Sequence, residues 1–177
     1  MTTFFTADEH YGDEGIIYFC DRGYPNPIIM NQDIISRHNS VVKPKDTVYH
    51  IGDVTFNSDI KLIKNILIQL NGTHILILGN HDNCNPFEFI EAGFRSVHTS
   101  LELEIDAYKV ILAHDPCIWT VVPKRTIFIC GHIHNLFRSI PDKLVVNAGV
   151  DVHDFFPISF KQVLEELGLN LPEKSQF

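Results

Sequence analysis

The feature that most constrains the fold is a set of short apolar segments, four to six residues long, that are rich in β-branched and aromatic residues. They are Thr3–Ala7, Thr47–Ile51, Thr73–Leu78, Tyr108–Ala113, Thr126–Cys130 and Lys143–Val146. Many are nearly continuous in hydrophobicity rather than alternating, which is the pattern of strands covered on both faces. The stretch from Arg95 to Ile105 is also strand-like, with a turn expected at Asp106-Ala107.

Helical patterns lie between these strands. Asn31–Val42, Ser58–Leu70 and Phe160–Leu167 place apolar side chains at helical spacing, and Gly72 follows the end of the second of them. Ser58 or Asn57 is the expected N-cap of that helix. The order of elements is β-α-α-β-α-β, then mostly strands, then a helix, which predicts a layered α/β sandwich.

The length and charge of the chain limit its organisation and its partners. A chain of 177 residues suits one domain, here 1–177, with a tail from about 171 to 177 that is expected to fray. The chain has 14 Lys and Arg against 22 Asp and Glu, a net charge of −8. Long nucleic acids and anionic membranes are bound largely through Lys and Arg, so both are unexpected partners. Metal ions could still neutralise a small phosphate.

The chain also lacks the marks of a secreted or membrane protein. No apolar run reaches the ~18 residues of a transmembrane helix, and the N-terminus has no basic region followed by an apolar one. None of Cys20, Cys84, Cys117 and Cys130 forms a Cys-x-x-Cys pair. We therefore expect reduced thiols in a cytoplasmic protein.

Polar clusters follow five of the expected strands. These clusters are Asp8-Glu9-His10, Gly52-Asp53, Gly79-Asn80-His81-Asp82, His114-Asp115-Pro116 and Gly131-His132-Ile133-His134. Ligands of α/β sheets bind outside the carboxyl ends of the strands, so all five clusters are expected at one edge. Singly, each cluster is a weak signal, because Gly, Asn and Asp are common in turns. Their conjunction, each directly after a strand, indicates a site.

The chemistry of these clusters points to metal. They offer carboxylates, imidazoles and one amide oxygen, a donor set that suits divalent ions such as Mn, Fe or Zn. The candidate ligands are Asp8, His10, Asp53, Asn80, His114, His132 and His134. Seven ligands are too many for one ion, whereas two ions that share a bridging carboxylate would use them all. Two metals ~3.5–4 Å apart can stabilise an in-line phosphoryl displacement.

The five clusters together resemble the motif series of the calcineurin-like metallophosphoesterases, from Phe4 to about Phe160. The stretches Thr47–Asp53, Gly149–Asp151 and Pro157–Ser159 resemble a small, capless bacterial and phage-type subgroup. The resemblance implies a four-layer αββα sandwich and a phosphoester hydrolase with two metal ions. Mn is the expected metal, with Fe, Zn, Ni and Co as alternatives.

The resemblance also implies a role for each motif residue. One ion would be held by Asp8, His10 and His134, and the other by Asn80, His114 and His132, with Asp53 bridging both. A metal-bridging hydroxide would attack phosphorus. His81 would protonate the leaving group as general acid, and Asp82 would orient His81.

Two positions depart from the subgroup pattern. Asp13 and Gly15 stand where a His and an Asn are common, and Glu9 and Asp13 are expected to repel an anionic substrate near the first motif. Outside the motifs, His50 is a candidate to bond a metal ligand, and His38 is expected to be packed. His74, His98 and His153 are expected on the surface, at an edge or in a solvated loop.

Further residues are candidates for substrate contact. Lys124, Arg125 or Arg138 could hold a phosphate. The aromatic rings of Trp119, Phe137, Phe155 and Phe156 could stack on a base.

The sequence leaves several functions open. A small phosphomonoester or nucleotide-type phosphodiester is the expected substrate. A non-catalytic metal-binding scaffold for protein interaction and a nuclease are the alternatives on the same fold.

Overall fold

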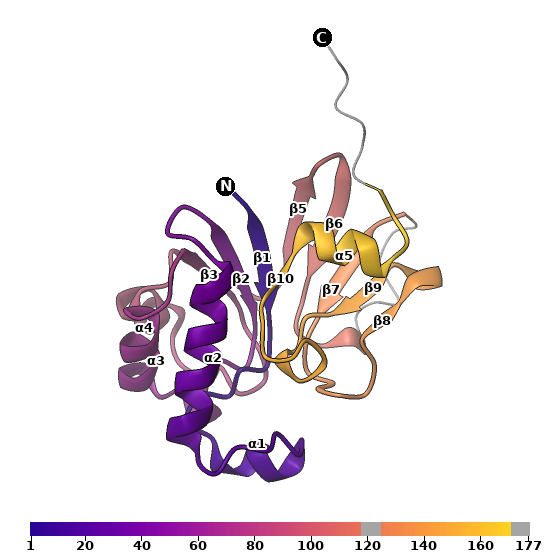
Figure 1. Cartoon of the computed structure of the whole chain (residues 1–177). Helices are drawn as coiled ribbons and strands as arrows, with labels where there is room; N and C mark the ends of the chain where they lie inside the picture. The colour runs from indigo at the N-terminus through magenta and orange to yellow at the C-terminus, as the bar shows by residue number, and fades with distance from the viewer. Residues whose placement is uncertain (118–124, 171–177) are drawn as a thin grey trace.

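The computed structural model describes residues 1–117 and 125–170 and contains two five-stranded sheets (Figure 1). The first has the order β10-β1-β2-β3-β4. In it β1 (Thr3–Thr6), β2 (Thr47–Ile51), β3 (Thr73–Ile77) and β4 (Ser96–His98) are parallel, and β10 (Ile158–Ser159) is antiparallel to β1.

The second sheet has the order β5-β6-β7-β9-β8. Its central strands β6 (Tyr108–Leu112), β7 (Ile127–Cys130) and β9 (Val145–Asn147) are parallel. Its edge strands β5 (Leu101–Ile105) and β8 (Ser139–Ile140) are antiparallel to their neighbours. The turn between β5 and β6 falls at Asp106-Ala107 as expected, and both residues have positive φ.

The main core lies between the two sheets. Phe5, Ile51 and Ile77 of the first sheet and Leu112 and Ile129 of the second belong to one cluster and are fully buried. Strands β1, β2, β3 and β7 are largely buried on both faces, which explains their nearly continuous apolar sequences. Burial of this kind contributes about 25 cal/mol for each Å² of apolar surface removed from water.

Helices flank the sheets, which confirms the expected α/β sandwich. The helices α1 (Glu14–Phe19), α2 (Pro27–Val41), α3 (Ile60–Leu67) and α4 (Pro86–Ala92) share one apolar cluster with Leu76 and Phe94 of the first sheet's side. Helix α1 lies across the end of the molecule at which β1, β2 and β3 finish (Figure 1).

The last helix, α5 (Phe160–Glu166), packs against the core between the sheets. The ring of Phe160 lies 6.4 Å from that of Phe5 and 6.1 Å from that of Tyr108, so α5 contacts both sheets. The outer face of the second sheet carries a small apolar cluster around Phe128 and Val145, in which no described α-helix takes part.

Some element boundaries differ from expectation for local reasons. Helix α2 begins at Pro27, because Asn26 caps it. Helix α3 is capped by Asp59 rather than by Asn57 or Ser58, which both have positive φ. Helix α4 was not expected, although Asn85 and Glu88 form a capping box at its start. The expected frayed tail from 171 lies outside the described residues. No helix within the described ranges is long and apolar enough to cross a membrane.

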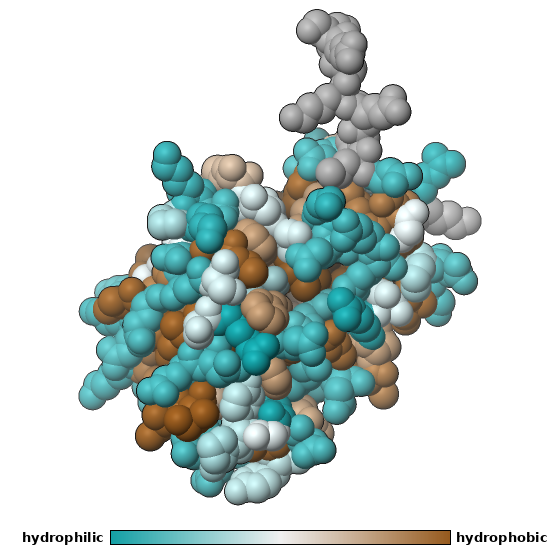
Figure 2. Space-filling model, viewed as in Figure 1, coloured by the Kyte–Doolittle hydropathy of each residue, from teal (hydrophilic) through white to brown (hydrophobic). Residues whose placement is uncertain are grey.

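The face seen in Figure 2 is mostly hydrophilic, with apolar residues in scattered patches.

Candidate metal centre and active site

The parallel strands bring the seven candidate ligands to one end of the molecule. Asp8 and His10 follow β1, Asp53 follows β2 and Asn80 follows β3. From the second sheet, His114 follows β6, and His132 and His134 follow β7. Their ligand atoms fall into two neighbouring groups.

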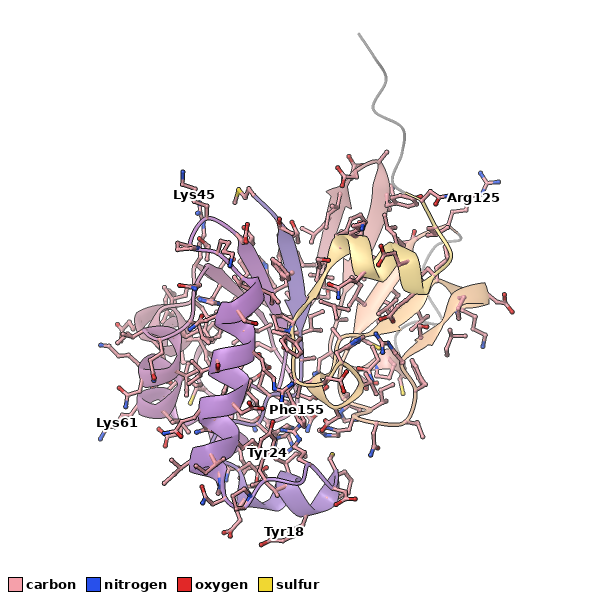
Figure 3. The ribbon with its side chains drawn as sticks, in the orientation of Figure 1. Tyr18, Tyr24, Lys45, Lys61, Arg125 and Phe155 are labelled. Atoms are coloured by element: carbon pink, nitrogen blue, oxygen red, sulfur yellow. The ribbon has the colours of Figure 1, made fainter. Side chains whose placement is uncertain are left out.

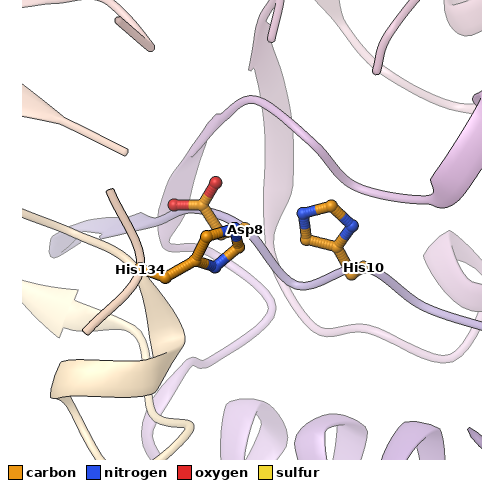
Figure 4. A group of neighbouring side chains, drawn as sticks. All are labelled: Asp8, His10 and His134. Carbon is orange, nitrogen blue, oxygen red and sulfur yellow. The ribbon is translucent and has the colours of Figure 1, made fainter. Parts of the chain in front are cut away.

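The first group consists of Asp8, His10 and His134 (Figure 4). One ligand atom from each lies within 4.8 Å of the others. The backbone N–H of His132 donates to both carboxylate oxygens of Asp8, at 3.0 and 2.9 Å. This contact ties the loop after β7 to the loop after β1 and so joins the two sheets at the site.

The second group consists of Asp53, His114 and His132, again within 4.8 Å. The amide oxygen of Asn80 lies 3.0 Å from His114 Nε2 and 2.8 Å from His132 Nδ1. Oδ2 of Asp53 lies 3.2 Å from His114 Nε2 and 3.8 Å from His10 Nε2 of the first group. Asp53 therefore stands between the groups, as a bridging ligand would.

The polar atoms of the site fit divalent metal ions. Both ring nitrogens of the buried His10 have no hydrogen-bond partner among the described residues. A buried imidazole without partners is costly unless something else uses its lone pair. Burial raises the pKa of Asp8 to about 7 and lowers that of His10 to about 4. A cation bound between them would favour the carboxylate and the neutral imidazole, which are the ligating forms.

Protons compete with metal at His114 and His134. Burial alone would lower the pKa of His114, but its hydrogen bond to Asp53 and the charge of Asp8 raise it to about 9. Burial alone would also lower the pKa of His134, but the hydrogen bond to Asp151 outweighs this effect and raises the pKa to about 10. Metal binding at these residues must therefore release protons.

The backbone of the ligand loops is strained. Five of the seven ligands have φ between 45° and 72°, in the left-handed region that residues other than glycine rarely adopt. These five are Asp8, His10, Asp53, His132 and His134.

Two of the motif glycines are required for steric reasons. A Cβ at Gly79 would run into Asp53 Oδ1, and one at Gly131 would lie 2.7 Å from Ala7 Cβ and 2.8 Å from Asp8 Oδ2. The chain passes so close to the ligand carboxylates at these two points that only glycine fits.

Comparison with known proteins agrees with this geometry. Residues 1–156 match the calcineurin-like phosphoesterase superfamily domain. The chain belongs to this superfamily. An uncharacterized protein of Methanocaldococcus jannaschii is 30% identical over 165 residues, which are 90% of this chain and 87% of the relative.

Two solved structures share the calcineurin-like fold. A protein of unknown function from Aquifex aeolicus matches with a TM-score of 0.72 and 25% identity, over 93% of this chain and 98% of its own. A structure described as a novel archaeal phosphodiesterase matches with a TM-score of 0.50 and 22% identity, over 84% of each chain. Family membership supports metal-dependent phosphoester hydrolysis and divalent metal binding at the His and Asp groups.

A buried arginine that the sequence did not single out supports the first metal group. The guanidinium of Arg22 donates to both oxygens of Asp151, at 2.7 and 2.9 Å, and to the backbone carbonyls of Asp8 and Glu9, at 2.7 and 2.9 Å. Oδ2 of Asp151 lies 3.0 Å from His134 Nδ1. Arg22 thus fixes both the Asp8 loop and the carboxylate that orients His134.

The histidines expected at the surface behave differently. His74 is buried, and its Nδ1 lies 3.0 Å from Nε2 of His50. His50 Nδ1 lies 2.6 Å from Glu9 Oε1. The surface expectation for His74 was therefore wrong, and His50 bonds the neighbour of two ligands rather than a ligand. Glu9 is buried and lines neither cavity beside the metal groups, whereas Asp13 lines the larger one, so the expected repulsion of an anionic substrate remains a prediction.

Of two further histidines, one lies where it was expected and the other does not. His38 is packed as expected, with its Nε2 2.8 Å from the carbonyl of Asn71. His153 is buried rather than solvated, because its Nε2 contacts the carbonyl of Asn147 at 2.7 Å.

His81 and Asp82 lie beside the metal groups. The ring of His81 lies 5.2 Å from that of His10, and the backbone N–H of His81 donates to Asp53 Oδ1 at 2.8 Å. Oδ2 of Asp82 accepts from the backbone N–H groups of Asp53 and Gly79, at 2.9 and 2.8 Å. Asp82 therefore holds the loop backbone, and its expected role in orienting the His81 ring remains a prediction.

Most of the suggested substrate contacts lie elsewhere. Phe155 packs on Tyr24, with ring centres 5.1 Å apart (Figure 3). The ring of Phe156 lies under the guanidinium of Arg37. Phe137 packs on the second sheet. Arg125 precedes β7, at the end opposite the site (Figure 3).

The two remaining basic candidates are Arg138 and Lys124. Arg138 pairs with Glu166 at 2.9 Å on the surface. Lys124 lies outside the described residues, and so does the aromatic candidate Trp119.

Cys20, Cys84 and Cys130 form no disulfide bond with another described residue.

Proposed function

We propose that this chain is a dinuclear metal-dependent phosphoesterase that hydrolyses small phosphomonoesters or phosphodiesters. The observation that carries the proposal is the position of Asp53, whose Oδ2 stands between His114 Nε2 and His10 Nε2, at 3.2 and 3.8 Å. When bound, two divalent ions lower the pKa of water and neutralise the charge of the phosphate.

The ligand set we propose follows the two groups in the structure. Asp8, His10 and His134 hold one ion, and Asn80, His114 and His132 hold the other. Asp53 serves both. Mn is the first metal to test, and Fe, Zn, Ni and Co suit the same donors.

His81 is the proposed general acid. Its ring is half-buried beside His10, and its backbone is held by Asp53 Oδ1 at 2.8 Å. This anchorage keeps the imidazole at the metal groups, within reach of the oxygen that leaves the phosphorus. A proton donated there assists alkoxide departure by about 10²- to 10⁴-fold.

The experiment uses metal-stripped protein that is resupplied with Mn and offered p-nitrophenyl phosphate and bis-p-nitrophenyl phosphate. We expect metal-dependent turnover, and the preferred ester distinguishes a monoesterase from a diesterase. His81→Ala should keep the metal and lose about 10²- to 10⁴-fold in kcat, least for esters with good leaving groups.

The matched control is His98→Ala, since the His98 ring bonds Ser96 Oγ at 3.0 Å and lines neither cavity beside the metal groups. An equal loss for leaving groups of different pKa would contradict the acid role. Bound metal without turnover of either ester would favour the non-catalytic scaffold.

A further inference from the structure

A cavity of about 470 Å³ opens beside the first metal group. Its walls include three imidazoles of the site, those of His10, His81 and His134, and two phenylalanines, Phe19 and Phe56. A smaller cavity of about 190 Å³ lies beside Asn80, His114 and His132. The proposed general acid His81 lines only the larger of these two cavities, so the group that leaves the phosphorus would occupy it.

The two phenylalanines stand at the ends of a row of rings. Phe56 lies 5.1 Å from His81, His81 lies 5.2 Å from His10, His10 lies 5.3 Å from His134, and His134 lies 5.9 Å from Phe19, measured between ring centres. Phe19 is 79% exposed and Phe56 is 48% exposed. Large apolar rings left open to water at a reaction centre are surfaces on which a planar group can stack.

The loop that carries Phe56 is held in place. Asn57 and Ser58 both have positive φ, so the chain turns sharply after Phe56. Ser58 Oγ donates to the carbonyl of His81 at 2.8 Å and accepts from the N–H of Asn83 at 2.7 Å. The exposed ring and the proposed acid therefore belong to loops that are bonded to each other.

The charge of the cavity limits what can enter. Among the described residues that line it, the only ionisable one besides the histidines is Asp13, and none is Lys or Arg. Asp13 Oδ1 accepts from the N–H of Gly15 at 2.7 Å, and Oδ2 lies 3.4 Å from His10 Nδ1. A leaving group with further phosphates would find no Lys or Arg among these described residues, whereas an uncharged one would meet apolar rings.

We propose that this cavity binds the leaving alcohol of the substrate, and that this alcohol is an uncharged nucleoside whose base stacks on Phe56, the exposed ring next to His81. The assignment of the leaving group rests on the proposed function, while the stacking surface does not. The substrate is then a nucleoside ester that carries a single phosphate.

The test compares ligands with and without the base. Binding to Mn-loaded protein is measured by calorimetry for the non-hydrolysable phosphonate analogues of adenosine 5′-monophosphate and ribose 5-phosphate. Stacking of one base on an aromatic side chain corresponds to about 5- to 150-fold in affinity. We expect the adenosine analogue to bind more tightly by a factor in this range.

Phe56→Ala should reduce that ratio, and Phe19→Ala, at the other end of the row of rings, should reduce it less. The control is Phe87→Ala, because Phe87 is 74% exposed on α4 and lines neither cavity. It should leave the ratio unchanged. Equal affinity for the two phosphonates, or a ratio unchanged by Phe56→Ala, would overturn the proposal. Tighter binding of adenosine 5′-diphosphate than of the monophosphonate would overturn the single-phosphate limit.

A turnover arm separates this proposal from the one on which it rests. The esters themselves, and their methyl diesters, share the same leaving oxygen and differ only in the base. A base-dependent ratio in binding without turnover of any ester would contradict the phosphoesterase and keep the nucleotide site. Turnover with no dependence on the base, in either KM or affinity, would contradict the nucleotide site and keep the phosphoesterase.

Discussion

Replacing Arg22 tests how the first metal group is held. Its side chain is fully buried, and so is most of its partner Asp151, at 0% and 3% exposure. Arg22→Met removes a positive charge and four hydrogen bonds to oxygen at 2.7 to 2.9 Å. The Asp151 carboxylate is then left buried without its charged partner, and the carbonyls of Asp8 and Glu9 lose a donor.

The expected cost in the free energy of unfolding is about 3–5 kcal/mol for the unpaired carboxylate. The two carbonyl bonds add about 0.5–1.5 kcal/mol each. Arg22→Met combined with Asp151→Asn removes both charges, so it should be more stable than Arg22→Met alone. Asp151→Asn by itself should weaken Mn binding by about 10- to 100-fold, because His134 loses the carboxylate that orients it.

Urea denaturation of the metal-free protein measures the change in the free energy of unfolding of the two Arg22 variants. Mn titration measures the loss of metal affinity in Asp151→Asn. The control is Arg37→Met. Arg37 pairs with Asp33 at 2.6 Å, one helical turn away, and both side chains are about a third exposed. That pair should contribute no more than about 1 kcal/mol. An Arg22→Met protein within 1 kcal/mol of the parent, or a double variant no more stable than the single one, would refute the reasoning.

Three further perturbations follow from the site. Asp53→Asn should weaken the binding of both metal ions together, since its carboxylate stands between the two groups. Unchanged metal content by elemental analysis would exclude Asp53 as the bridging ligand. Gly79→Ala should weaken metal binding because its Cβ meets Asp53 Oδ1, whereas Gly23→Ala, with nothing within 4 Å, should not. Burial lowers the pKa of His74 to about 3 from 6.5, so below pH 6.5 only the unfolded chain takes up this proton and stability falls as the pH falls. His74→Asn should make the pH dependence of unfolding shallower by about 1.4 kcal/mol per pH unit between pH 6 and 4, and an unchanged slope in urea melts would contradict this.

The convergence of the candidate ligands could be predicted because it depends on local order along the chain. Each candidate ligand follows directly after an apolar strand, and parallel strands end at the same edge. The strand pattern therefore placed Asp8, Asp53 and His114 near one another although they lie far apart in sequence. The continuous apolar strands predicted a layered α/β sandwich with cover on both faces, whereas the expectation of two sheets came from the resemblance to the calcineurin-like metallophosphoesterases.

The supporting contacts could not be predicted, because they join distant residues with no periodic signal. Arg22 and Asp151 are 129 positions apart, and nothing near Arg22 distinguishes it from a surface arginine. The direction of Glu9 was also hidden, since it lies between two ligands but bonds His50 on the other side of the strand. Phe19 and Phe56 looked like two of thirteen core phenylalanines.

The left-handed backbone at five ligands bears on how this protein could change over generations. Glycine adopts that conformation freely, so at Asp8, His10, Asp53, His132 or His134 a mutation to glycine would relieve local strain of the order of 1 kcal/mol or more. Selection for stability alone would then favour the loss of ligands. A descendant without selection for metal binding would accumulate glycine in these loops and become more stable. Keeping all five side chains against that drift requires selection on the site itself.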